Sequence, residues 1–136
     1  MGFFNKKNNN IEEKVILIDK NVKENSNILD FNGLLKINNQ KLNRILKSVN
    51  DESIFLDEDL RLICKSEIEH FEERYQCKLE GLIPLIDVSN NDFIVYICTK
   101  NTFGIYNIVD ELLFEEDIDI TEIINKLDLY NKQQSD

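Results

Sequence analysis

The sequence predicts an α+β fold in which a mainly antiparallel β-meander sheet is flanked by about four helices. Apolar residues recur at helical spacing on both sides of the centre of the chain. The centre, residues 82–108, contains three apolar runs separated by short polar breaks. The 136 residues, 42% hydrophobic and 31% charged, are enough for one folded core and too few for two. We therefore expect a single domain over residues 11–131, between flexible polar ends at 1–10 and 132–136.

Two helices are expected before the central strands. The first has a capping box followed by apolar residues at helical spacing: Asn10 with Glu13, then Ile11, Val15, Ile18 and Val22. Its middle, residues 15–18, is also compatible with a strand. The second helix begins after Asn39 and has the i, i+3, i+4, i+7 pattern of an amphipathic helix: Leu42, Ile45, Leu46 and Val49.

Two further helices are expected, one directly before the central strands and one after them. Ser66 and Glu69 form a capping box for the third helix, whose apolar face contains Ile68, Phe71 and Tyr75. Its charged side chains are expected to face water: Glu67, Glu69, Glu72, Glu73 and Arg74. The fourth helix has a cap formed by Asp119 with Glu122 and the most regular apolar face in the chain: Ile120, Ile123, Ile124, Leu127 and Tyr130.

The tandem Asn90–Asn91 predicts the first turn of the meander, because asparagine tolerates the positive φ that a two-residue type I′ turn requires. This turn would pair Val88 with Phe93, Ile86 with Val95, and Pro84 with Ile97. A second turn at Lys100–Asn101 would pair Cys98 with Phe103, Tyr96 with Ile105, Val95 with Tyr106, and Phe93 with Ile108. Pro84 has no backbone N–H, so it should lie at the start of its strand or on an edge. We also expect a short fourth strand around residues 112–114.

Charge is distributed unevenly along the chain. The net charge is −10, but residues 1–50 carry +4 and residues 51–136 carry −14. An acidic surface repels a phosphate backbone, so direct binding of nucleic acid is disfavoured and a basic protein is the expected partner. The densest acidic run gives the candidate partner-binding residues: Asp110, Glu111, Glu115, Glu116, Asp117 and Asp119.

The same acidic run has two interpretations. Leu113, Phe114 and Ile118 lie within it and would serve as apolar anchors for a partner if they are exposed. A second group of acids at residues 57–59, Asp57, Glu58 and Asp59, could extend the surface. The other interpretation is a solvated acidic loop before a helix, whose N-terminus favours negative charge.

Residues able to carry out chemistry are few. Cys64, Cys77 and Cys98 match no zinc-binding spacing, and we expect them to be unpaired and buried. His70 is the single histidine and is expected on the surface. The sequence has no Gly-rich phosphate loop, nucleophile elbow or metalloprotease helix. We therefore expect no catalytic residue, no metal and no cofactor.

Six segments in succession resemble the SUKH superfamily, which contains fungal cell-wall-synthesis regulators of the Smi/Knr type and bacterial immunity proteins. They are LDEDLRLI at 56–63, SEI at 66–68, GLIPL at 81–85, NDFIVY at 91–96, and the segments 103–110 and 121–127. The resemblance covers about residues 54–127. The preceding part departs from the family pattern, since Leu34-Leu35-Lys36 lacks the usual proline and Val49-Asn50-Asp51 lacks the usual glycine. The subfamily therefore stays open.

The resemblance implies a SUKH-like fold and a binding role without catalysis. The first hypothesis is an immunity protein that neutralises a cognate bacterial toxin by occluding its active or substrate-binding surface. The alternative is a regulatory adaptor that recognises an endogenous protein. No apolar run is long enough to cross a bilayer, and the first ten residues lack the apolar core of a signal peptide. We therefore expect a cytoplasmic protein that does not bind membranes.

Overall fold

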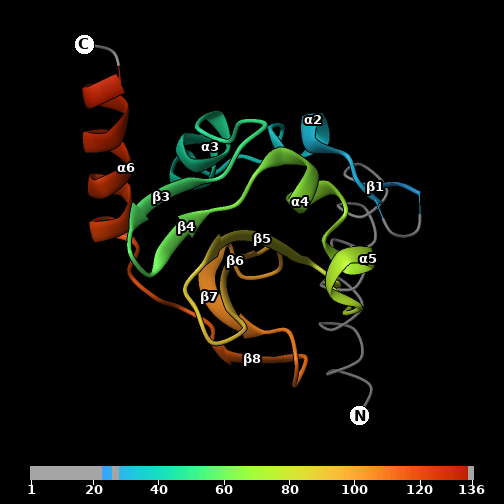
Figure 1. Cartoon of the computed structure of the whole chain (residues 1–136). Helices are drawn as coiled ribbons and strands as arrows, with labels where there is room; N and C mark the ends of the chain where they lie inside the picture. The colour runs from blue at the N-terminus through green and yellow to red at the C-terminus, as the bar shows by residue number, and fades with distance from the viewer. Residues whose placement is uncertain (1–22, 26–27, 135–136) are drawn as a thin grey trace.

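The computed structural model describes residues 23–25 and 28–134 (Figure 1). The helix expected from Asn10 to Val22 lies outside these residues. Within them, no helix is both long and apolar enough to span a bilayer.

A six-stranded antiparallel sheet forms the centre of the fold. Its strands are β3 Ile54–Asp57, β4 Leu60–Leu62, β5 Leu82–Asp87, β6 Asp92–Ile97, β7 Thr102–Asn107 and β8 Leu112–Glu115. Strand order in the sheet follows chain order from β3 to β8, so the sheet is a continuous meander. Two short strands, β1 Lys23–Asn25 and β2 Ile28–Leu29, form a separate pair. The predicted α+β class and the fourth central strand, β8, are confirmed, whereas the β3–β4 hairpin was not expected.

Within the described part of the chain, five helices accompany the sheet: α2 Phe31–Leu34, α3 Gln40–Lys47, α4 Lys65–Glu69, α5 Phe71–Tyr75 and α6 Thr121–Gln134. α6 packs beside α3 and β3, and α4 packs against β5, as Figure 1 shows. Because these helices cover the sheet, every residue of the run 93–98 in β6 and just after it is buried. α6 continues to Gln134, past residue 131, where we placed the end of the domain.

The second and fourth predicted helices are confirmed as α3 and α6. Asn39 caps α3, and its Oδ1 accepts a hydrogen bond of 2.9 Å from the Leu42 amide. Of the expected apolar face, Leu42, Ile45 and Leu46 are at most 1% exposed, whereas Val49 lies after the end of α3 and is partly buried. Before α6, Asp119 Oδ1 accepts a hydrogen bond of 2.9 Å from the Thr121 amide. The buried residues of α6 are Ile124 and Leu127, Ile120 directly before the helix is also buried, and Ile123 and Tyr130 are partly buried.

The third predicted helix is wrong in three respects. It is two short helices, α4 and α5, because His70 departs from helical geometry with φ −109° and ψ 23°. Cys64, not Ser66, stands before the first turn of α4, and no side chain caps it. Glu67, expected to face water, is only 2% exposed. The break at His70 rotates the two helices relative to each other, so one continuous helical wheel does not describe their faces.

The predicted strand register is also wrong, although the two turns occur where they were expected. The first turn has three consecutive residues at positive φ, Ser89 at 78°, Asn90 at 59° and Asn91 at 65°, and the Val88 amide donates to the Asp92 carbonyl at 3.0 Å. The connection is therefore one residue longer than a type I′ turn. Pro84 pairs with Val95 instead of Ile97.

Further along β5, an irregularity between Pro84 and Ile86 shifts the pairing by one residue, so Ile86 pairs with Ile94. In the next hairpin Val95 pairs with Gly104 instead of Tyr106, a shift of two residues. Because side chains alternate with a period of two, residues of β6 and β7 predicted to share a face of the sheet still share it. The expectation for Pro84 holds only locally, because Pro84 is the third residue of β5 and β5 lies between β4 and β6. β4 pairs only with Ile86 and Asp87, so among the described strands Pro84 has a neighbour on the β6 side alone.

Candidate partner-binding surface

The six predicted partner-binding acids are all exposed and lie on one continuous segment around β8. Asp110 and Glu111 belong to the turn before β8, Glu115 ends the strand, and the other three follow it: Glu116, Asp117 and Asp119. Together they form what we call the acidic edge. No Lys or Arg occurs between Lys100 and Lys126, so the formal charge of this segment is not balanced along the chain.

Gly104 allows β8 to lie close to β7. A Cβ atom at Gly104 would come within 2.2 Å of the Glu115 carbonyl oxygen, which is closer than any side chain allows. The pairing of β7 with β8 is irregular at this point, between Ile105 and Tyr106. After β8, the Ile118 amide donates to the Phe103 carbonyl at 2.9 Å, and Thr102 Oγ1 donates to the Glu116 carbonyl at 2.6 Å. These bonds hold the acidic edge against β7.

The turn before β8 is fixed by side chains. Asn107 Oδ1 accepts hydrogen bonds from the amides of Val109 at 3.0 Å and Asp110 at 2.9 Å. Glu111 has a positive φ of 50°, and its Oε1 accepts a hydrogen bond of 3.0 Å from the Lys78 amide. Glu111 therefore fastens the turn to the segment that leads into β5.

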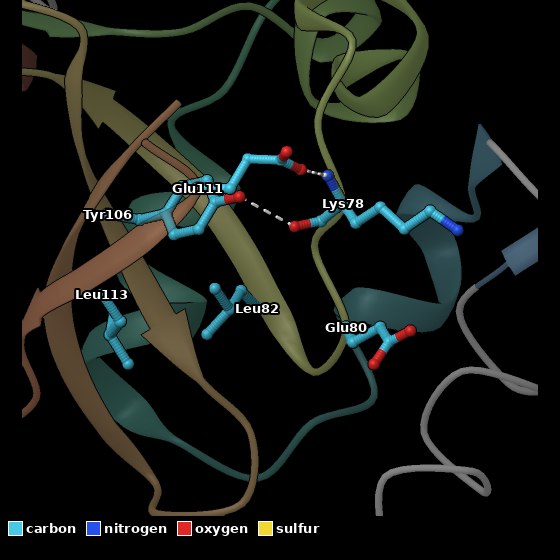
Figure 2. A pocket seen from close by; sticks show the side chains of 6 residues that line it. All are labelled: Lys78, Glu80, Leu82, Tyr106, Glu111 and Leu113. Carbon is cyan, nitrogen blue, oxygen red and sulfur yellow. Dashed lines mark hydrogen bonds between the residues drawn. The ribbon is translucent and has the colours of Figure 1, made fainter. Parts of the chain in front are cut away.

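A shallow hollow lies where that segment meets the β7–β8 hairpin (Figure 2). Its lining is Lys78, Glu80, Leu82, Tyr106, Glu111 and Leu113. The Tyr106 hydroxyl donates to the Lys78 carbonyl at 3.0 Å. Burial, with Cys77 nearby, raises the pKa of Tyr106 above its ordinary value, so the phenol keeps the proton that it donates. The hollow thus combines an apolar floor with carboxylates from Glu80 and Glu111.

Exposed apolar side chains accompany the acidic edge. Phe114, predicted as an anchor, is 51% exposed, whereas Leu113 and Ile118 are half-buried against the core. Sequence reasoning missed Leu112 and Val109, which are 51% and 69% exposed. Alternation along the strand could have identified Leu112, because it lies two residues before Phe114 and so on the same face of β8.

Besides Glu111, two of the acids have partners within the protein. Glu116 Oε1 lies 2.7 Å from Lys100 Nζ in a pair that is half exposed on both sides, so solvent screens it. Hydrogen bonds from the Thr121 hydroxyl and amide hold the pKa of Asp119 below its usual value. Asp119 is therefore ionised over the whole physiological range.

The acids at residues 57–59 lie in and beside the β3–β4 hairpin, at the other end of the strand order from β8. Lys126 of α6 donates to Asp57 at 3.0 Å, and this hydrogen bond lowers the pKa of the Asp57 carboxyl. Asp59 accepts from Ser89 Oγ at 3.3 Å. Their contacts are with α6 and with the β5–β6 turn.

A buried ionic network was not predicted at all. Arg61 of β4 makes a bidentate pair with Glu67 of α4, at 2.8 and 2.9 Å, and a third bond of 2.9 Å to Asp87 of β5. The Tyr75 hydroxyl of α5 donates to Glu67 at 2.6 Å, and Ser53 Oγ accepts from Arg61 at 2.8 Å. No sequence signal marks this network, because its members come from four elements and none is adjacent to another in the chain.

The residues considered for chemistry are dispersed. Cys77 and Cys98 are buried, Cys64 is half-buried, and all three are free thiols. Burial, with the Glu111 and Glu72 carboxylates nearby, raises the pKa of Cys77 to about 11, which disfavours the thiolate that a nucleophile requires. His70 is exposed between α4 and α5. Within the described residues, no group of three or more His, Cys, Asp and Glu side chains could hold a metal ion.

Comparison of the chain with family models, with curated proteins and with solved structures gives no match. The functional argument therefore depends on the surface itself and on the resemblance of the sequence segments described above.

Proposed function

We propose that this protein is a non-catalytic immunity protein that binds a cognate toxin with a basic surface and blocks the toxin's active or substrate-binding site. The observation that carries the proposal is the acidic edge, where six exposed carboxylates flank the exposed residues Leu112 and Phe114 along the chain. An interface of this kind uses apolar anchors for affinity and charge for orientation and rapid association. The SUKH-like succession of sequence segments supports the immunity role.

Occlusion follows from the charge pattern. A toxin that acts on nucleic acid has a cationic groove for its substrate, and a row of carboxylates on a rigid strand can occupy that groove in place of phosphates. The acidic edge is held by backbone bonds to β7 and by Glu111, so its main chain needs little ordering when it binds.

The test is charge reversal with a matched control. One variant combines Glu115→Lys, Glu116→Lys and Asp117→Lys; the control combines Asp51→Lys, Glu52→Lys and Glu73→Lys, three exposed acids outside the acidic edge. Each replacement changes the charge by two, so both variants have a net charge of −4 instead of −10. We expect the first variant to associate with the toxin encoded beside this gene about tenfold more slowly at low salt, and the control to be little changed.

Equal association rates and equal salt dependence for the two variants would exclude the acidic edge from the mechanism. Capture of an endogenous protein in place of a toxin, with the same dependence on the acidic edge, would support the adaptor role instead.

A further inference from the structure

β8 has a free edge. It is the last strand of the sheet, and among the described strands only β7 pairs with it. At the opposite end of the sheet α6 packs beside β3, whereas Figure 1 shows no described helix alongside β8. An edge strand presents unpaired backbone N–H and C=O groups, which can pair with a strand from another molecule.

Side chains on both faces of β8 could contact an added strand. Leu112 and Phe114 point to one face and are half exposed. Leu113 points to the other face, where it lines the hollow with Leu82 and Tyr106. An extended peptide paired with β8 places alternate side chains on the two faces, so it would contact the apolar pair on one side and reach the hollow on the other.

Charge selects the kind of strand. A second copy of this chain paired edge to edge would bring the six carboxylates of each acidic edge against those of the other, which is unfavourable. A lysine- or arginine-rich strand would instead neutralise them. The hollow suits such a side chain, because Leu82 and Leu113 can cover its aliphatic stem while its cation reaches the carboxylate of Glu80 or of Glu111, which Figure 2 shows on opposite sides of the hollow.

Two features keep the hollow receptive to a cation. Glu111 uses Oε1 for the Lys78 amide, and a carboxylate has acceptor positions for more than one donor. Lys78 is the one basic residue of the lining, and Figure 2 shows its ammonium group pointing away from Tyr106 and Glu111.

We propose that the free edge of β8 accepts an extended basic segment of the partner as an added β-strand, with one lysine or arginine side chain seated in the hollow. The inference rests on the proposed function, since it specifies how the acidic edge engages its partner.

The probe is a short peptide that alternates Lys and Val, added to the full chain labelled for amide NMR. Its control is the same peptide with N-methylated backbone amides, which keeps the charge and removes the donors of the ladder. We expect shifts centred on residues 111–117, slower amide exchange in β8, and roughly tenfold weaker binding of the control peptide. Equal binding of the two peptides, or shifts without slower exchange in β8, would show attraction by charge alone and overturn strand addition.

A pair of variants tests the hollow. Glu80→Gln should lower the affinity for the Lys–Val peptide by about threefold to tenfold. Glu73→Gln, the same change at an exposed position of α5, should leave this affinity unchanged. Equal affinities of these variants would remove the hollow from the proposal. If the charge-reversal variant loses the toxin but the peptide does not protect β8, strand addition fails and the immunity role stands. If the peptide protects β8 but charge reversal leaves toxin binding unchanged, the strand site stands and the acidic edge is excluded from toxin binding.

Discussion

Glu67→Gln should destabilise the protein by about 2–3 kcal/mol. Glu67 accepts two hydrogen bonds from Arg61 and one from Tyr75 while only 2% exposed. Glutamine has one acceptor oxygen, so its amide N–H₂ group would face a donor of Arg61 or of Tyr75. Each hydrogen bond to a charged group contributes about 1.5–3 kcal/mol, and at least one is lost.

The partial exposure of the network limits the loss. Removing one partner of a fully buried ion pair costs about 3–5 kcal/mol, because the other charge is left uncompensated. Arg61 and Asp87 are 20% and 30% exposed, so Asp87 and water still stabilise the guanidinium after the substitution. The expected cost is therefore below that range.

Urea unfolding followed by far-UV circular dichroism at neutral pH measures this difference. Tyr75→Phe keeps the bidentate pair and removes one hydrogen bond to the carboxylate, so it should cost about 1.5 kcal/mol, the lower end of the range for a hydrogen bond to a charged group. Glu73→Gln is the exposed control on the same helix as Tyr75 and should stay within about 0.5 kcal/mol of the wild type. A loss below about 0.5 kcal/mol for Glu67→Gln would refute the claim that the network holds α4 on the sheet.

The pH dependence of the free energy of unfolding gives a second test of the ionised Glu67–Arg61 pair, because the direction of the change can be predicted. Burial alone would raise the pKa of Glu67, but the hydrogen bonds from Arg61 and Tyr75 outweigh it and hold the pKa below its usual value. A depressed folded-state pKa contributes stability that is fully present above the unfolded value of about 4.3 and is lost as pH falls through the folded pKa. The difference in stability between wild type and Glu67→Gln should therefore shrink below about pH 4; a constant difference would contradict the ionised pair.

Three further substitutions or reactions test other parts of the structure. Gly104→Ala should destabilise the chain by about 1–3 kcal/mol and shift the β8 amide resonances, because its Cβ would meet the Glu115 carbonyl; an unchanged unfolding midpoint and spectrum would refute the close approach. Asn39→Ala should cost about 1 kcal/mol through loss of the α3 cap, measured by urea unfolding, and no loss would contradict the cap. In the native protein at pH 8, a thiol reagent should modify the half-buried Cys64 well before Cys77, whose pKa burial raises to about 11; equal rates would contradict the burial.

The elements that sequence reasoning placed correctly are those with a strong local signal. α3 and α6 have an apolar stripe together with a polar side chain before the first turn, and both signals lie within one helix. The tandem Asn90–Asn91 likewise marked a chain reversal through its tolerance of positive φ. The exposed acidic edge was predictable because charges without neighbouring cations remain in water.

The errors came from nonlocal causes. The register of β5 with β6 depends on a positive φ at Ser89 as well as at the two asparagines, and on an irregularity next to Pro84. Neither feature has a local signature in the sequence. The β3–β4 hairpin was missed because its strands have four and three residues, too few for alternation to be recognised. Glu67 was misplaced because burial of a glutamate depends on Arg61 reaching it from another element.

The two groups of charge in this protein have opposite roles, and their separation makes the binding experiments interpretable. In the network around Arg61, each charge has a partner of opposite sign and the pairing fixes α4 and α5 on the sheet. In the acidic edge, like charges repel one another, and the ion pair between Glu116 and Lys100 is exposed and contributes at most about 1 kcal/mol. Reversing charges at the acidic edge should therefore leave the fold intact, so a lost association would report on contact with the partner and not on unfolding.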